Sequence, residues 1–310
     1  MSKVVSHWSA DAVVLVAIGA VLVLHLLGMR SISAEAKRLG RPRPAGAGAQ
    51  AVAFYCGLCA VLVALVSPLA YWAGHFIWVR SLQDVLLAVI APGLIVLGAP
   101  WLVLARGASS LRPARVPATQ PGSGHGRAGH DGPGSPVRAE WSWLAWPVVV
   151  TVAFNAVWLG WHLPGPYDAV LRYPAAGAAE VVAYLGLGIA FWLQLIGSRP
   201  LTPRFPPMSR FMLVAATVFA TSVLAMVLMF DNAVLYHRYA GPAHRVLSVV
   251  SDQQVGGSVL FAVALPPLIV VGVALCIRWL AAEESEALNA GFDRLLKPRA
   301  SAWPSRPGLR

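Results

Sequence analysis

The stretch FMLVAATVFATSVLAMVLMF at residues 211–230 decides the fold, because it contains no charged side chain. A helix of about 20 apolar residues is long enough to cross the hydrocarbon core of a bilayer. Six more apolar runs lie on either side of it, bounded by charged residues or by Pro and Gly clusters. They cover residues 10–28, 48–67, 83–104, 143–162, 175–197 and 255–280. The sequence therefore predicts an all-α, polytopic membrane bundle of about seven helices.

The composition supports the same fold class. Of the 310 residues, 57% are hydrophobic and only 12% are charged, and the mean hydropathy is +0.65. A water-soluble fold has too little interior to hide so much apolar surface. The net charge of +11 would suggest a nucleic-acid partner for a soluble protein. Here the basic residues lie between apolar runs, so we expect the partner to be the lipid bilayer and not nucleic acid.

The distribution of Lys and Arg predicts the orientation. Nineteen of the 24 lie in one set of alternating loops, and short loops rich in these cations stay in the cytoplasm. We therefore expect the N-terminus outside and the C-terminus in the cytoplasm. Residues 1–280 would form the transmembrane domain, with a disordered cytoplasmic loop at about 106–142 that is rich in Gly, Pro and Ser. Residues 281–310 would form a cytoplasmic tail. Pro92 and the Pro266-Pro267 pair predict kinks in their helices.

Polar side chains gather at the expected outer ends of the spans. Ionisable groups at membrane depth are costly and are usually paired, water-facing or functional. Glu180 lies about one turn inside its span, so it needs a neighbour, and Arg80, Arg172 or His162 would serve. The acids and histidines at this end are Asp84, Asp168, Glu180, Asp231, Asp252, His75, His162, His237 and His244. Imidazole and carboxylate groups bind metals, so these residues form the candidate site.

Other motifs have simpler explanations. Cys56 and Cys59 form a C-x-x-C pair in mid-helix, where cysteines behave as small hydrophobic residues. Met226 and Met229 share a helix face but are typical of bundle packing. No span carries a nucleophile and base at a workable spacing, so the sequence does not predict an enzyme.

Taken in order, the motifs at the outer ends resemble the multi-spanning CtaG family of cytochrome c oxidase assembly factors over roughly residues 50–280. Individually the motifs are short, and their order and spacing make the resemblance specific. They are Ser67-Pro68, the run Gln83 to Pro100, Trp161-His162-Leu163-Pro164, Tyr167-Asp168, Glu180 with Phe191-Trp192, and Asp252-Gln253-Gln254-Val255-Gly256-Gly257.

The resemblance implies an integral assembly factor for a haem-copper oxidase in the bacterial cytoplasmic membrane, with oxidase subunits as partners. It implies copper as a candidate cofactor, presented at the outer face. The implied metal ligands are His162, Asp84, Glu180 and Asp252. The implied motif and structural positions are Gln83, Trp161, Pro164, Gln253, Gly256 and Gly257.

Three positions depart from the family pattern. Arg80, Asp84 and Val181 stand where the family commonly has histidine. A carboxylate is a harder ligand than imidazole and disfavours Cu(I). Three readings stay open: weak copper binding, binding through Asp84 with His162, or a scaffolding role. The alternative function is a copper or proton transporter, which would need polar residues continuing to the cytoplasmic side.

Overall fold

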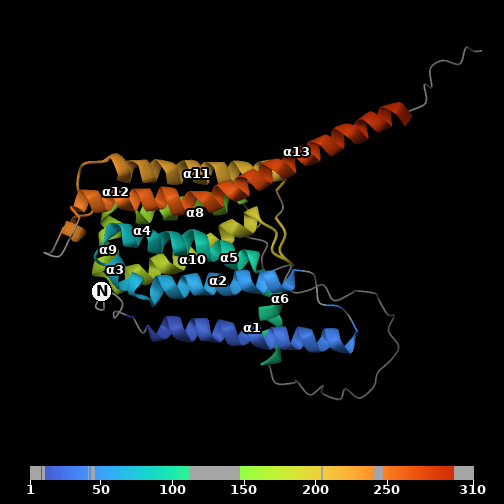
Figure 1. The fold of residues 1–310 in the computed structure, drawn as a ribbon, viewed down its shortest axis with the longest axis horizontal. Helices are drawn as coiled ribbons and strands as arrows, with labels where there is room; N and C mark the ends of the chain where they lie inside the picture. Colours follow the sequence, from blue (N-terminus) through green and yellow to red (C-terminus); the bar gives the residue numbers. More distant parts are fainter. Residues whose placement is uncertain are drawn as a thin grey trace, which may run out of the picture.

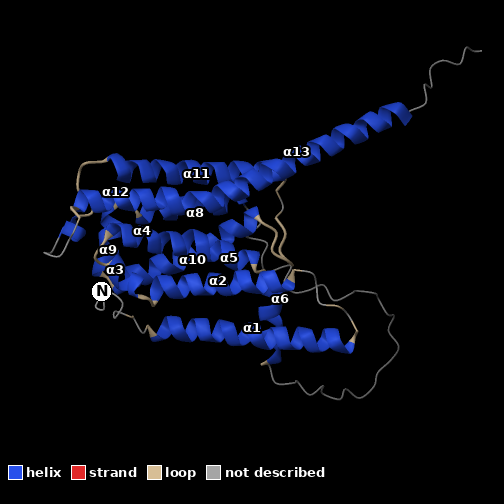
Figure 2. Ribbon diagram, viewed as in Figure 1, coloured by secondary structure: helices blue, strands red, loops and turns tan. Residues whose placement is uncertain are grey.

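The computed structural model describes residue 8, residues 11–40, residue 42, and residues 46–111, 147–203, 205–240 and 247–296. Within these ranges the regular elements are helices, apart from one isolated bridge between Ser198 and Leu201 (Figure 2). Most of the long helices run side by side in one bundle, and the far end of the last one projects beyond it (Figure 1). The chain therefore has the predicted all-α fold.

Six helical segments in the described ranges are long and apolar enough to cross a membrane. A seventh is obtained when α8 (Pro147–Trp161) and α9 (Pro164–Arg172), which are bent by 71° to one another, count as one span. This number confirms the predicted membrane helix bundle. The six are α1 (Ala12–Arg38), α2 (Ala47–Leu65), Ile77–Leu97, α10 (Pro174–Leu195), α11 (Pro207–Phe230) and Val249–Asn289.

Two of the spans contain a π-helical turn. The span Ile77–Leu97 consists of α4 (Ile77–Val85), η1 (Leu86–Ile90) and α5 (Ala91–Leu97). The last span consists of α12 (Val249–Val259), η4 (Leu260–Ala264) and α13, which continues to Leu296. Both π-turns, η1 and η4, end two residues before the prolines for which kinks were expected. A proline lacks a backbone N–H and interrupts the regular hydrogen-bond ladder, and a π-turn accommodates that interruption without ending the helix.

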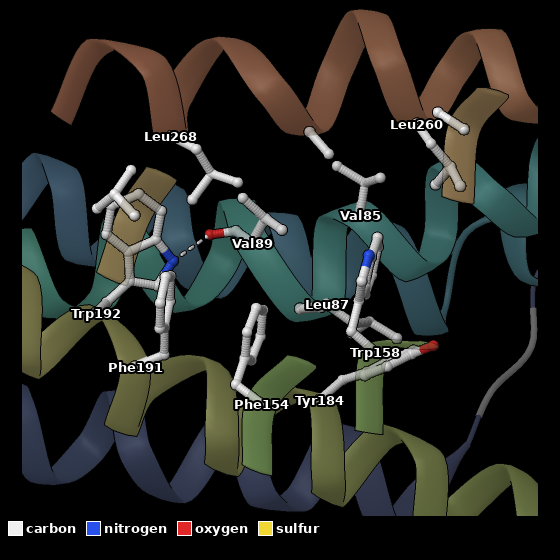
Figure 3. Packing of buried hydrophobic residues seen from close by; sticks show 14 of the residues in the cluster. Val85, Leu87, Val89, Phe154, Trp158, Tyr184, Phe191, Trp192, Leu260 and Leu268 are labelled. Carbon is white, nitrogen blue, oxygen red and sulfur yellow. Dashed lines mark hydrogen bonds between the residues drawn. The ribbon is translucent and has the colours of Figure 1, made fainter. Parts of the chain in front are cut away.

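The span Ile77–Leu97 is the central helix of the bundle. It is the most buried of the spans, with 72% of its apolar window inside the protein. Its core neighbours come from α8, α10, η4 and α13, and the indole Nε1 of Trp192 donates a hydrogen bond of 2.9 Å to the carbonyl oxygen of Val89 (Figure 3). That bond satisfies a backbone carbonyl in the irregular turn, as an apolar environment requires.

The limits of this span differ from the predicted 83–104. The helix begins six residues earlier and ends at Leu97, because Ala99 adopts a left-handed φ of 43° and Pro100 follows it. The next helix, α6 (Trp101–Ser110), is separate. The predicted span began at residue 83 and so left Arg80 in the outer loop before it. This placement is wrong, because Arg80 lies inside α4 and is buried.

Two boundaries expected from the sequence fall partly outside the described residues. The loop expected at about 106–142 can begin only after Ser110, where α6 ends. Residues 112–146 lie outside the described residues. The expected tail begins as a continuation of α13 to Leu296, and residues 297–310 lie outside the description.

The short elements α3 (Pro68–Ala73), α9 and η3 (His237–Ala240) lie together at one end of the bundle, which we call the α9 end (Figure 1). Helix α6 contacts α1 near the opposite end. An added Cβ at Gly28 of α1 would lie 1.9 Å from the carbonyl oxygen of Val103, and one at Gly107 of α6 would lie 1.9 Å from that of Leu24. The two glycines therefore permit a backbone contact that anchors α1.

We predict that Gly28→Ala destabilises the protein, because the new methyl group forces α1 away from α6. Overpacking of this kind costs about 1–3 kcal/mol. The matched control is Gly19→Ala on the same helix, where an added Cβ meets nothing within 4 Å. The thermal midpoint of the detergent-solubilised protein is the measurement, and equal midpoints for the two variants would contradict the close-contact reading.

The orientation is also open to test. From the Lys and Arg distribution we predict that the α9 end is outside and that α6 and the tail are cytoplasmic. A periplasm-dependent phosphatase inserted after Asn232 should be active, and one fused after Arg310 should be inactive. A fluorescent protein at the same two sites should give the reverse pattern. The opposite result at both sites would overturn the assignment.

Candidate functional site

The site at the α9 end is built around the buried guanidinium of Arg80. Its Nε lies 3.2 Å from Oδ1 of Asp84, one turn further along α4, and its Nη1 donates to Oε1 of Gln83 at 3.3 Å. Its Nη2 pairs with Oε2 of Glu180 on α10. All four side chains are buried. Arg80 thus supplies the partner that Glu180 was predicted to need.

The network extends to α2 and to the connection between α8 and α9. Gln83 donates from Nε2 to the carbonyl oxygen of Ala64 on α2 at 2.7 Å. Nε2 of His162, which lies between α8 and α9, is 3.8 Å from Oδ2 of Asp84. That distance is too long for a hydrogen bond. Side chains from α4 and α10 and the α8–α9 connection therefore face one another around Arg80.

The tautomer of His162 follows from its second nitrogen. Nδ1 lies 2.8 Å from the carbonyl oxygen of Trp158, and a carbonyl can only accept, so Nδ1 carries the hydrogen. In the neutral ring Nε2 is then an unprotonated acceptor facing the carboxylate of Asp84. At 3.8 Å from Oδ2 of Asp84 this nitrogen makes no hydrogen bond, so His162 is positioned mainly by its backbone contact and by the rings around it.

Aromatic side chains enclose the network. The ring of Tyr167 lies 5.9 Å from Cζ of Arg80 and stacks on Tyr236 with 3.9 Å between centroids. Trp158 contacts both His162 and Tyr184, with centroids 4.8 and 5.6 Å apart. Such rings exclude water and so strengthen the electrostatic interactions of the charged groups.

Two tyrosines connect the segment around η3 to the α9 end. The hydroxyl of Tyr236 donates to the carbonyl oxygen of His162, and that of Tyr239 donates to the carbonyl oxygen of Ala73, both at 2.8 Å. Burial raises the pKa of both hydroxyls, so they remain protonated donors. These contacts hold residues 236–239 against α3 and the α8–α9 connection.

Asp252 on α12 caps a helix to which it is not connected in sequence. Its Oδ2 accepts from the backbone N–H of Ile77 at 2.9 Å, and its Oδ1 accepts from that of Trp78 at 3.1 Å. Phe76, at the N-cap position of α4, makes no side-chain cap hydrogen bond. A carboxylate at this position satisfies free N–H groups and complements the helix dipole. Asp252 therefore positions the helix that carries Arg80.

The residues of α12 that follow Asp252 contact the loop after α11 and the helices α4 and α11. Gln253 accepts from the N–H of Leu235 at 3.1 Å and donates to the carbonyl oxygen of Ala233 at 3.3 Å. An added Cβ at Gly256 would lie 3.0 Å from Oγ of Ser81, and one at Gly257 would lie 2.7 Å from the carbonyl oxygen of Ala225. The glycines thus lie where α12 approaches α4 and α11 closely.

The structure groups only part of the predicted site. Glu180, Asp84, His162 and Gln83 surround Arg80, whereas both carboxylate oxygens of Asp252 bind the start of α4. Trp161 packs against the apolar core, and Pro164 begins α9 after the bend. Cys56 and Cys59 are exposed on α2, and Met226 is half exposed on α11.

Sequence reasoning missed the central role of Arg80 and the tyrosines that enclose it. One signal was available, because residues four apart share a helix face. Arg80 and Asp84 are four apart, as are Glu180 and Tyr184. Tyr236 and Tyr239 gave no comparable signal, since they reach the site from the short segment around η3.

The residues present do not fit a resident copper ion. Asp84, Glu180 and His162 each keep a buried polar atom without a hydrogen-bond partner, as a ligand would. However, the cation between the two carboxylates is already Arg80, and the set supplies a single imidazole and no sulfur. Among the described residues, no three His, Cys, Asp or Glu side chains are placed to hold a metal together. Cu(I) favours sulfur and imidazole ligands, which this site does not assemble.

We predict that Asp252→Ala destabilises the bundle because two N–H groups at the start of α4 lose a charged acceptor. Hydrogen bonds to charged groups contribute about 1.5–3 kcal/mol each. The thermal midpoint in detergent is the measurement. Gln254→Ala is the matched control, since its side chain is neighbouring and partly exposed. If both variants unfold at the same temperature, the capping role of Asp252 is disproved.

The chain is similar to known bacterial proteins over most of its length. The family described as "Cytochrome c oxidase caa3 assembly factor (Caa3_CtaG)" matches residues 23–282. Two similar proteins, both described as uncharacterized, come from Mycobacterium bovis and Mycobacterium leprae. They are 23% and 22% identical to this chain over 90% and 88% of its length, and the match covers 40% and 39% of their own lengths. The chain thus spans about two fifths of these relatives. No solved structure matches.

Proposed function

This chain belongs to the cytochrome c oxidase caa3 assembly factor family, and from that membership we propose that it helps to assemble a haem-copper oxidase in a bacterial cytoplasmic membrane. The observation that carries the proposal is the extent of the match. It runs from the middle of α1 into α13 and so includes every element of the Arg80 network. The proposed partners are subunits of the oxidase, and the proposed role is not enzymatic.

The apolar character of the central helix supports assembly over transport. Beyond Asp84 its sequence is VLLAVIAPGLIVL through Leu97, without a polar side chain. A conduit for protons or metal ions needs polar groups or water along its length. The charged network at the α9 end does not continue along this helix. A scaffold needs no such continuation.

The proposal gives the network a positioning role. Arg80 joins α4 to α10, Gln83 joins α4 to α2, and Asp252 joins α4 to α12. Together they fix the end of the bundle that the Lys and Arg distribution predicts to be outside. A rigid surface at that end would suit a client whose metal centre is completed outside the membrane. We include in the proposal that copper is presented at this end only transiently, as a substrate passed on to the oxidase. This role requires no resident copper ion.

Deletion of the gene tests this function. We expect the activity of the oxidase and the copper content of the purified oxidase to fall together, and the intact gene should restore both. Succinate dehydrogenase activity in the same membranes is the control for general membrane damage. Complementation with Gly19→Ala should match the wild type. Unchanged oxidase activity and copper content after deletion would remove the proposal.

A further inference from the structure

The two buried carboxylates of the network share one cation, and that cation is a side chain of this protein. Asp84 and Glu180 come from different helices, yet both face the guanidinium of Arg80. Carboxylates converging from separate helices on one cation are also the way in which proteins hold divalent metals. Here Nε and Nη2 bind the carboxylates, and Nη1 binds the amide oxygen of Gln83.

We propose that Arg80 is a tethered cation that occupies the place of an external ion, so that the network is closed to metals and becomes a cation-binding site only when this side chain is removed. The proposal does not depend on the assembly function, because it concerns which ion the network can hold. It would stand for a scaffold of any client.

The chemistry of arginine makes this occupancy permanent. The guanidinium stays charged in proteins and offers five N–H donors in a planar fork. A metal ion that bound Asp84 and Glu180 would leave the guanidinium buried without its partners and close to a second positive charge. Removing one partner of a buried ion pair is strongly destabilising, so the metal would have to overcome that loss.

The groups that face Arg80 from the surrounding elements do not offset this loss. Among the described residues, the connection between α8 and α9 contributes the one imidazole in contact with the network, that of His162. Helix α9 contributes Tyr167, and the hydroxyl of Tyr239 from η3 is already bonded to Ala73. Neutral tyrosines and one histidine are a poor replacement for the two carboxylates that the metal would take from the guanidinium.

Chemical rescue tests the proposal directly. Arg80→Ala, purified in detergent or nanodiscs, should unfold at a lower temperature than the wild type. Methylguanidinium has only a few non-hydrogen atoms, so we expect it to bind in the millimolar range. At about 10 mM it should therefore raise the thermal midpoint of Arg80→Ala. Urea at the same concentration is planar but neutral and should have no effect. Wild type should respond to neither, and Arg80→Ala/Glu180→Gln should lose most of the rescue.

Two further measurements keep the proposal falsifiable if Arg80→Ala does not fold. Arg80→Lys keeps the positive charge but has fewer N–H donors than the guanidinium. Its thermal midpoint should be lower than that of the wild type and should not respond to methylguanidinium. Wild type titrated with Cu²⁺ or Zn²⁺ should show the same binding as Asp84→Asn and Glu180→Gln. Metal binding by the wild type that either variant abolishes would overturn the proposal. So would the absence of any methylguanidinium response in folded Arg80→Ala.

Discussion

The structure depends on pairing three ionisable side chains with one another inside an apolar bundle. Arg80, Asp84 and Glu180 are all buried, and an isolated charge in such surroundings would be prohibitively costly. Their mutual pairing lowers this cost only if α4 and α10 keep one relative position. The ion pairs are therefore better understood as fixing the arrangement of the helices than as a source of net stability, which buried pairs seldom supply.

The remaining contacts at the α9 end serve the same arrangement. Asp252 and Gln253 are adjacent on α12 and bind different segments. Asp252 caps α4, and Gln253 bonds to the backbone of residues 233–235. Tyr236 and Tyr239 then bind the backbone of His162 and Ala73. Polar side chains in this part of the bundle mostly bind backbone groups, because a backbone group buried in an apolar bundle needs an internal partner. Most of the polar residues that the sequence marks as candidate ligands thus serve to hold the helices and loops of this end together.

Much of the candidate site could be located in advance, but not its connections. The positions of Glu180 and His162 near span ends follow from hydropathy, and a partner for Glu180 was expected on grounds of charge. Asp252 illustrates the limit. As a carboxylate at a helix start it resembles a ligand, and only the contact with Ile77 and Trp78, about 175 residues earlier in the chain, identifies it as a cap. Such long-range backbone contacts leave no periodic signature in sequence.

The sequence by itself determined that the chain forms a bundle of six to seven membrane-length helices. The length and hydropathy of a span are local properties, and they are set by the thickness and apolarity of the bilayer core. The sequence also determined which family motifs are present. Only the tertiary structure decided that Arg80 belongs to the interior and that its guanidinium is the cation shared by Asp84 and Glu180. The physical reason is that pairing energy depends on which helices become neighbours. That choice is made by packing, including close contacts such as those at Gly256 and Gly257.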